Sequence, residues 1–198
     1  MIKYLILFVA ALVSEVSFCQ SDFNDCRDEL LKGLKSKNYI NPDIFIDWEK
    51  CLKGKAFPTL SLETIDGSII KTDSLKGKVI VVNLWFINCY PCIAELPALN
   101  KFVKKKKKKD VVFLAISLDS KERLESDFIP KHKFDFTVIP ASQKHVDILG
   151  RTGFPTTYII DKNVNVHTVW AGGEIGKFAD TEAYTKAKPI IKKLLKAE

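Results

Sequence analysis

The stretch VIVVNLWFINCYPCIAELP, residues 79–97, determines how the rest of the chain is organised. Its first part, Val79–Leu84, is apolar and rich in β-branched residues, which predicts a strand buried on both faces of a sheet. Two cysteines follow in Cys89-Tyr90-Pro91-Cys92, and Asn88 before them is a residue type that commonly caps a helix. The stretch therefore predicts a strand that delivers two thiols to the first turn of a helix.

Two cysteines on one helical turn can form a disulfide that opens and closes. At a helix N-terminus, unpaired N–H groups and the helix dipole favour a thiolate over a thiol. We therefore predict Cys89 as the nucleophile and Cys92 as the resolving thiol of thiol–disulfide exchange. Tyr90 and Pro91 are expected to tune the couple, since proline fixes one φ angle. Glu95 follows Cys92 by three residues and is predicted to exchange a proton with it, the alternative being a surface position on the helix.

The same cysteine spacing occurs in half of a zinc site. A zinc site needs two more ligands at compatible spacing, whereas this chain has no second C-x-x-C and its three histidines are scattered. Covalent haem attachment requires a histidine directly after the second cysteine, and Ile93 stands there. We therefore expect no metal and no other cofactor.

Further motifs accompany the two cysteines in a fixed order. They are Leu75-Lys76-Gly77-Lys78 before the strand, Asn83-Leu84-Trp85 ahead of the cysteines, C-x-x-E-x-P from Cys92 onward, and Gly153-Phe154-Pro155-Thr156-Thr157 downstream. With these motifs, residues 55–198 resemble the TlpA/ResA-like thiol–disulfide oxidoreductases, the extracytoplasmic branch of the thioredoxin superfamily.

The resemblance implies an α/β protein of thioredoxin fold, in which helices flank a central mixed sheet. An N-terminal β-hairpin and a TlpA-like insertion accompany this core. It also implies that Cys89 and Cys92 are the redox pair, that Glu95 is the acidic residue typical of the ResA-like group, and that Pro155 is a cis-proline facing the disulfide. From the residues alone a trans bond is expected, because only about 5–6% of X-Pro bonds are cis. A cis bond would place the backbone of Phe154 beside Cys89, where it can pair with an incoming peptide.

The predicted substrate contacts surround the two cysteines. One of them, the Trp85 indole, is expected to be partly exposed beside Cys89, the alternative being a place in the core. The predicted contact residues are Trp85, Tyr90, Pro91, Phe154 and Pro155.

The pattern downstream of residue 55 alternates strands and helices. The helix between its two longest strands is long enough for a parallel, right-handed βαβ unit, and Pro97 predicts a kink near the start of that helix. The predicted elements are strands at 59–62 and 68–71, strand 78–85, helix 90–107, strand 111–118, helix 119–131, strand 136–139, helix 142–149, a hairpin of 156–160 and 164–170, and helix 179–195.

Residues 1–19 resemble a secretory signal. Lys3 and the apolar run Leu5–Val13 are followed by a short region that ends at Cys19, and the run is too short to span a membrane. We therefore predict a cleaved signal peptide and an exported protein of the periplasm or cell envelope. The first alternative is a lipoprotein acylated at Cys19, although Phe18 fills a position that normally holds a small residue. The second alternative is an uncleaved membrane anchor.

Residues 20–54 form a charged segment with helical patterns around Cys26 and Cys51. Disulfides persist outside the cytoplasm, so we predict a structural disulfide between these two cysteines, the alternative being two buried free thiols. The segment is too short to form a convincing domain alone. We expect it to be a helical N-terminal extension that packs on a thioredoxin-like domain of residues 55–198.

The net charge of +7 is concentrated in one run, because Lys104–Lys109 supplies six of the charges and leaves +1 for the rest. We interpret this run as a solvated helix end that complements the helix dipole. The alternative is docking to an anionic membrane or an acidic partner. A nucleic-acid partner would need a broader basic surface with interleaved aromatic residues, so we expect none.

Together these features predict an exported protein disulfide oxidoreductase that reduces disulfides of specific proteins. In the resembled family, electrons come from a membrane thiol-transport protein and substrates include apocytochrome c, which suggests cytochrome c biogenesis as one role. One alternative is a peroxiredoxin-like peroxidase, although Asn88-Cys89 lacks the threonine–proline environment expected there. The other is a binding or stress-protective module that barely uses its dithiol.

Overall fold

The computed structural model describes residues 22–35, 43–105, 110–150, 153–176 and 178–197. The predicted signal peptide, including Cys19, and residues 106–109 of the lysine run lie outside the described residues. None of the described helices is both long and apolar enough to cross a membrane.

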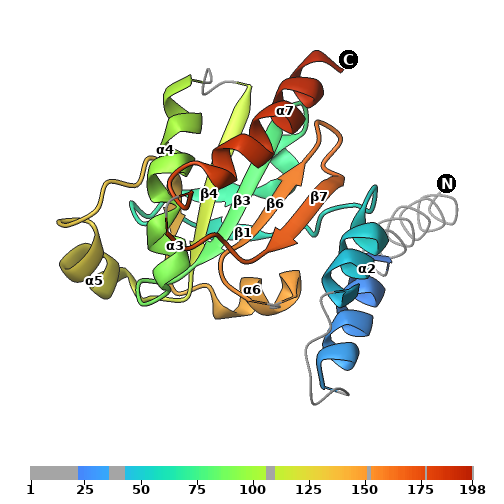
Figure 1. Cartoon of the computed structure of the whole chain (residues 1–198), viewed down its shortest axis with the longest axis horizontal. Helices are drawn as coiled ribbons and strands as arrows, with labels where there is room; N and C mark the ends of the chain where they lie inside the picture. Colours follow the sequence, from blue (N-terminus) through green and yellow to red (C-terminus); the bar gives the residue numbers. More distant parts are fainter. Residues whose placement is uncertain (1–21, 36–42, 106–109, 151–152, 177, 198) are drawn as a thin grey trace, which may run out of the picture.

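A mixed sheet of five strands forms the centre of the protein (Figure 1). Strand β3 pairs in parallel with β4 and antiparallel with β6, and every residue of β3 is buried. The predicted mixed sheet and its parallel βαβ unit are therefore confirmed. In spatial order the strands are β5 (Thr137–Ile139), β4 (Val111–Ser117), β3 (Val79–Trp85), β6 (Thr156–Ile160) and β7 (Val166–Ala171).

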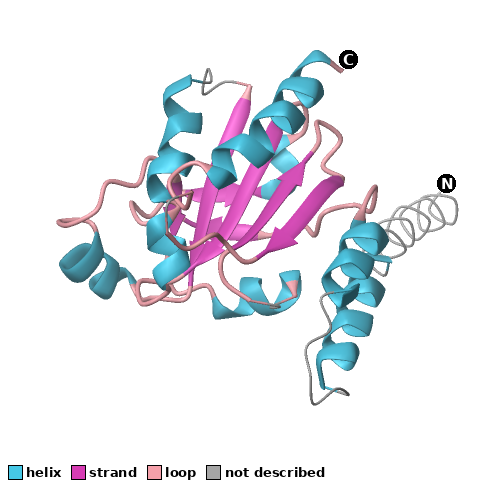
Figure 2. Ribbon diagram, in the orientation of Figure 1, coloured by secondary structure: helices cyan, strands magenta, loops and turns pink. Residues whose placement is uncertain are grey.

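Helices α3 (Tyr90–Ala94), α4 (Leu96–Lys105) and α7 (Glu182–Lys196) cover one face of this sheet (Figure 2). The helix predicted over 90–107 is divided between α3 and α4 at Glu95. Pro97 explains the division, since it has no N–H to donate and its ring conflicts with the carbonyl group four residues earlier. Glu95 is thereby placed at a corner of the backbone directly behind the cysteines.

The opposite face is covered by the N-terminal extension and by helix α6 (Gln143–Leu149). Residues 22–35 are helical and lie beside α2 (Asp43–Leu52), to which the disulfide Cys26–Cys51 joins them (Figure 1). The extension packs on the sheet through buried aromatic side chains, including an edge-to-face contact between Trp48 and Tyr158. The segment therefore shares the core of the rest of the chain.

Shorter elements complete the chain around the sheet. The N-terminal hairpin consists of β1 (Ser61–Glu63) and β2 (Ile69–Lys71), and the 3-10 turn η1 (Thr72–Leu75) leads from it towards β3. Where a helix over 119–131 is predicted, the chain forms the short helix α5 (Lys121–Arg123) and then a wider π-helical turn, η2 (Leu124–Phe128). This turn buries Leu124 and Phe128 against the core.

Candidate functional site

Cys89 and Cys92 are joined in a disulfide where the loop after β3 enters α3. The two residues are 5 % and 1 % exposed. Cys89 itself caps the helix, in place of the predicted Asn88, because its Sγ atom accepts the N–H of Cys92 at 3.3 Å. An N–H group directed at this sulfur stabilises a thiolate on it once the disulfide is reduced.

Glu95 is buried behind the disulfide and is not a surface residue of the helix, since it is 3 % exposed. Its Oε1 atom accepts a hydrogen bond of 2.9 Å from the Nδ2 atom of Asn83 on β3, and the same amide donates to the Oγ1 atom of Thr157 at 3.1 Å. Burial raises the pKa of Glu95 to about 8, against the effect of the Asn83 hydrogen bond, and the charge of Glu182 raises it further. The site thus contains a carboxyl group that titrates near neutral pH.

The Phe154–Pro155 peptide bond is cis, and Pro155 lies beside the C-x-x-C turn. Gly173 lies against both Pro155 and the C-x-x-C turn, because a Cβ atom added to Gly173 would be 3.1 Å from Cγ of Pro155 and 3.6 Å from Cβ of Pro91. The N–H of Gly172 also donates to the carbonyl group of Pro155 at 2.8 Å. Three segments that are distant in sequence therefore meet at the disulfide. The part played by Gly173 was not predicted from the sequence.

The aromatic residues of the site differ in exposure. Trp85 is only 1 % exposed, so the expectation of partial exposure is wrong. Its ring packs 4.5 Å from Phe128 and 5.3 Å from Phe134, centroid to centroid, and both partners come from the insertion after β4. Tyr90 is 68 % exposed, and the half-buried Phe154 packs edge to face on Phe86 at 5.1 Å.

Asp119 is a buried carboxylate that the sequence did not single out. It follows β4, is 6 % exposed, and its Oδ2 atom accepts the N–H of Ile87 at 2.6 Å. The hydroxyl group of Ser117 donates to the same oxygen at 3.1 Å, and Nη1 of Arg123 donates to Oδ1 at 2.8 Å. Asp119 therefore fixes the loop between β3 and Cys89.

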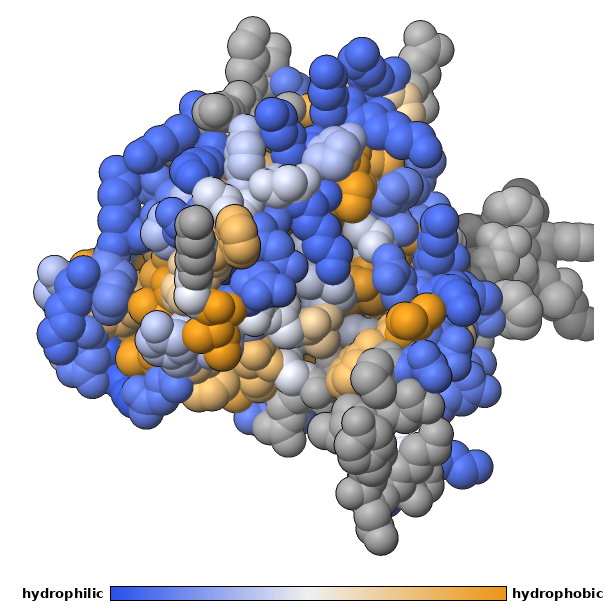
Figure 3. All heavy atoms as spheres, in the orientation of Figure 1, coloured by the Kyte–Doolittle hydropathy of each residue, from blue (hydrophilic) through white to orange (hydrophobic). Residues whose placement is uncertain are grey.

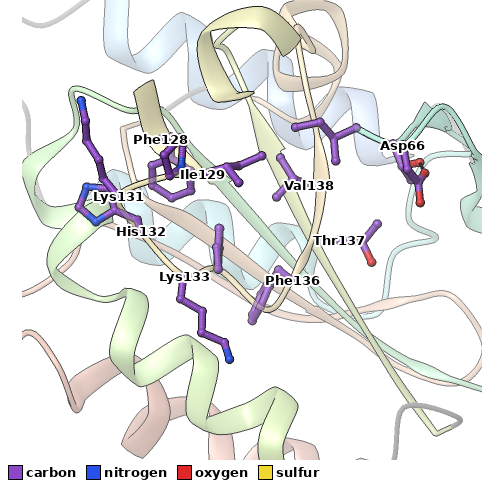
Figure 4. Close-up of a pocket in the computed structure, with 13 residues that line it drawn as sticks. Asp66, Phe128, Ile129, Lys131, His132, Lys133, Phe136, Thr137 and Val138 are labelled. Carbon is purple, nitrogen blue, oxygen red and sulfur yellow. Dashed lines mark hydrogen bonds between the residues drawn. The ribbon is translucent and has the colours of Figure 1, made fainter. Parts of the chain in front are cut away.

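A cavity of about 650 Å³ lies between the β1–β2 turn and residues 128–138 (Figure 4). Lys131 and His132 lie on one side of it and Asp66 on the other, and neither cysteine of the redox pair lines it. Among the residues that the structure describes, no group of three or more histidine, cysteine or acidic side chains is arranged to hold a metal ion.

Comparison with known proteins identifies relatives of this chain. Residues 53–169 match the sequence model of the AhpC/TSA family. The thiol-disulfide oxidoreductase ResA of Bacillus anthracis is 32% identical over 123 residues, which cover 62% of this chain and 71% of that protein. Among solved structures, a putative thiol:disulfide interchange protein DsbE from Chlorobium tepidum matches with a TM-score of 0.63 and 25% identity, over 72% of this chain and 97% of that one.

Proposed function

Because the chain belongs to the AhpC/TSA family and is a ResA-like disulfide oxidoreductase of thioredoxin fold, we propose that it reduces disulfides of specific proteins outside the cytoplasm. The observation that carries this proposal is the Cys89–Cys92 disulfide at a helix N-terminus, with a buried carboxyl group behind it. The peroxidase and binding-module alternatives are not favoured, because the relatives are named as thiol–disulfide oxidoreductases.

The reaction begins with the reduced dithiol. The thiolate of Cys89 attacks one sulfur of a substrate disulfide, so that a mixed disulfide forms and the first substrate thiolate leaves. Cys92 then loses its proton and attacks the Cys89 sulfur, which forms the Cys89–Cys92 disulfide and releases the second substrate thiolate. Two electrons pass from the dithiol to the substrate, and its two thiolates take up protons.

Glu95 is the proposed partner of Cys92 in this proton transfer. Its pKa of about 8 lies near the ordinary value of a cysteine thiol, so a proton moves between the two groups at little cost in free energy. The hydrogen bond from Asn83 holds the carboxyl group in one orientation.

The substrate is proposed to lie over Tyr90 and Pro91 on one side and Phe154 and Pro155 on the other. These residues come from two of the three segments that meet at the disulfide. Trp85, being buried, is proposed to support this surface from below.

Export is proposed from residues 1–19, with lipid attachment through Cys19 as the alternative. The Cys26–Cys51 disulfide supports export, because structural disulfides persist in oxidising compartments. A reductant in such a compartment needs electrons, and the family resemblance suggests a membrane thiol-transport protein as the donor. The same resemblance suggests apocytochrome c as one example of a substrate.

The proposal is tested by the reduction potential of the Cys89–Cys92 couple, equilibrated against dithiothreitol or glutathione. A value near or below about −220 mV is expected, whereas a value near about −120 mV would mean that the protein makes disulfides. Cys92→Ala should trap substrates as mixed disulfides on Cys89, because the resolving thiol is missing. Cys89→Ala is the matched control and should trap none.

A further inference from the structure

We propose that a basic face formed by α4 and α7 binds the surface of an anionic membrane. The inference adds a docking surface to the proposed function and does not depend on the redox chemistry. The basic face consists of six exposed lysines of the two helices, which are Lys104, Lys186, Lys188, Lys192, Lys193 and Lys196.

The excess charge of the protein is concentrated on these two helices, which lie on the same face of the sheet (Figure 2). Together α4 and α7 contain eight lysines and one glutamate, Glu182, so their charge equals the net charge of +7 of the whole chain. The rest of the chain therefore carries equal numbers of basic and acidic residues. Folding thus adds the lysines of α7 to those at the end of α4, from which they are distant in sequence.

Three of the lysines form one row along α7. Residues four apart lie one above the other on a helix, so Lys188, Lys192 and Lys196 make a lysine stripe. All three are exposed, and Figure 3 shows hydrophilic side chains gathered along this side of the helix. The opposite side of α7 is buried against the sheet and consists of Ala183, Ala187, Ile191 and Leu194.

Contacts at both ends of α7 fix the lysine stripe in place. The Tyr184 ring packs 4.7 Å from the Phe102 ring of α4, and Nζ of Lys188 lies 5.6 Å from the centre of the Tyr184 ring. At the other end, Nζ of Lys162 donates a hydrogen bond of 3.4 Å to the carbonyl group of Leu195. The row of charges is therefore presented on a rigid helix.

The charges of the lysine stripe are available to an external anion. Within the part of the chain that the structure describes, the ion pairs all involve other basic residues. The only acidic residue of α4 and α7 is Glu182, which stands at the start of α7 and not beside the stripe.

The composition of the basic face favours a lipid surface over a protein partner. Every cation of α4 and α7 is a lysine, whereas protein–protein interfaces are enriched in arginine and depleted in lysine. The six large apolar side chains that are exposed among the described residues all lie outside these helices, so the face lacks an apolar anchor for a protein. Attraction to anionic headgroups needs no such anchor, and each lysine near the surface strengthens it about fivefold.

Binding through the lysine stripe leaves the redox disulfide uncovered. Glu182 begins α7, and its charge raises the pKa of Glu95 behind the disulfide, so this end of the helix lies near the redox site. The stripe extends from about 9 to about 21 Å beyond Glu182 along the helix axis. A membrane-bound protein therefore presents Cys89 away from the lipid surface.

The inference is tested by sedimentation with two kinds of vesicle, one of phosphatidylcholine alone and one that also contains phosphatidylglycerol. An apolar leader or a lipid on Cys19 would bind both kinds, so the readout is the ratio of the affinity for anionic vesicles to that for neutral ones. The wild-type protein should prefer the anionic vesicles. The preference should disappear when NaCl is raised to about 0.5 M, because salt screens exposed charges.

Replacing Lys188, Lys192 and Lys196 together by glutamine should lower the ratio by about 10²-fold. The matched control changes the net charge equally through three exposed lysines outside the basic face, and it should keep the wild-type ratio; these are Lys32, Lys71 and Lys144. An unchanged ratio in the stripe variant, an equal loss in both variants, or a preference that survives high salt would overturn the inference.

Two further measurements separate the orientation and the partner. Dithiothreitol should reduce the Cys89–Cys92 disulfide equally fast with and without anionic vesicles, and protection by the vesicles would overturn the assigned orientation. A wild-type protein that ignores anionic vesicles but is retained by immobilised polyglutamate would assign the basic face to an acidic protein and overturn the membrane proposal. Failure of the proposed redox function would leave the vesicle measurements unchanged, because binding does not use the dithiol.

Discussion

Asn83 on β3 donates a hydrogen bond of 2.9 Å to the carboxyl group of Glu95, which is buried behind the redox disulfide. The amide is neutral, so it orients the carboxyl group without supplying a compensating positive charge. The effect of burial on the pKa of Glu95 therefore exceeds that of the hydrogen bond, and the pKa is raised to about 8.

The first prediction concerns stability as a function of pH. The folded protein holds the Glu95 proton up to about pH 8, whereas the unfolded chain releases it near the ordinary value of 4.5. Between these values the folded state binds more protons, so stability falls as pH rises, by about 5 kcal/mol for this one group. Urea denaturation of the oxidised protein from pH 4 to 9 measures the fall, and Glu95→Gln should remove it. If the free energy of unfolding fell with pH equally in the wild-type protein and in Glu95→Gln, that result would contradict the assigned pKa.

The second prediction concerns the resolving step. Glu95→Gln cannot accept the Cys92 proton, so release of substrate from the mixed disulfide should slow by about 10²-fold at pH 8, where about half of the Glu95 carboxyl groups of the wild-type protein are ionised. Rapid quenching with acid and separation of the mixed disulfide measures this rate. Glu182→Gln is the control, because it removes a charge that raises the Glu95 pKa and leaves Glu95 in place. It should shift the pH dependence of the rate to lower pH, and equal slowing by both variants would argue against the proton transfer.

A third prediction concerns Asp119, whose Oδ2 atom accepts a hydrogen bond of 2.6 Å from the N–H of Ile87. Asp119→Ala should lower the free energy of unfolding by about 2–3 kcal/mol, because it leaves a part-buried N–H group without its acceptor and removes the nearer of the two carboxylates that face Arg123. Asp127→Ala is matched to it, since Asp127 also faces Arg123, at 3.8 Å, but is exposed. That variant should change stability by less than about 0.5 kcal/mol in the same urea titration.

A fourth prediction compares two glycines, Gly173 beside Pro155 in space and Gly153 two residues before it in the chain. Gly173→Ala places a methyl group 3.1 Å from Pro155 and should cost about 1–2 kcal/mol of stability through crowding. Gly153→Ala meets nothing within 4 Å and should be close to neutral. Thermal unfolding of both variants measures the difference. Equal stability would show that the Pro155 loop yields to the added methyl group.

The fifth prediction concerns the second disulfide. Replacing Cys26 and Cys51 together by alanine should lower the free energy of unfolding by about 3 kcal/mol, as expected for a loop closed across a sequence separation of 25. The reduction potential of the Cys89–Cys92 couple should stay the same, because the Cys26–Cys51 disulfide belongs to the cluster on the opposite face of the sheet. A shifted potential would instead link the extension to the redox site.

The sequence predicted those features that depend on neighbours in the chain. The apolar run of β3, the cysteine spacing after it and Pro97 specify strand, dithiol and helix break within about 20 residues. Glu95 was found because it lies one turn beyond Cys92 on the same helical pattern.

Other features depend on partners that are distant in sequence. Trp85 is buried by Phe128 and Phe134, and Gly173 is required by Pro155, but no local pattern connects these residues. The helix expected over 119–131 forms only over residues 121–128, and its second part is π-helical, for the same reason. Packing of its apolar side chains on the Trp85 cluster selects a π-helical turn that local helical periodicity does not indicate.

The sharing of one core by the extension and the sheet has a practical consequence for any shortened version of this chain. The family match begins at residue 53, so a fragment cut there retains both redox cysteines and every strand. It would nevertheless expose Tyr158 and the aromatic side chain of Phe57, which now pack against Phe23 and Trp48. We expect such a fragment to aggregate even though it contains all the catalytic residues. The residues needed for folding extend beyond those needed for catalysis, and the exposed apolar side chains promote association.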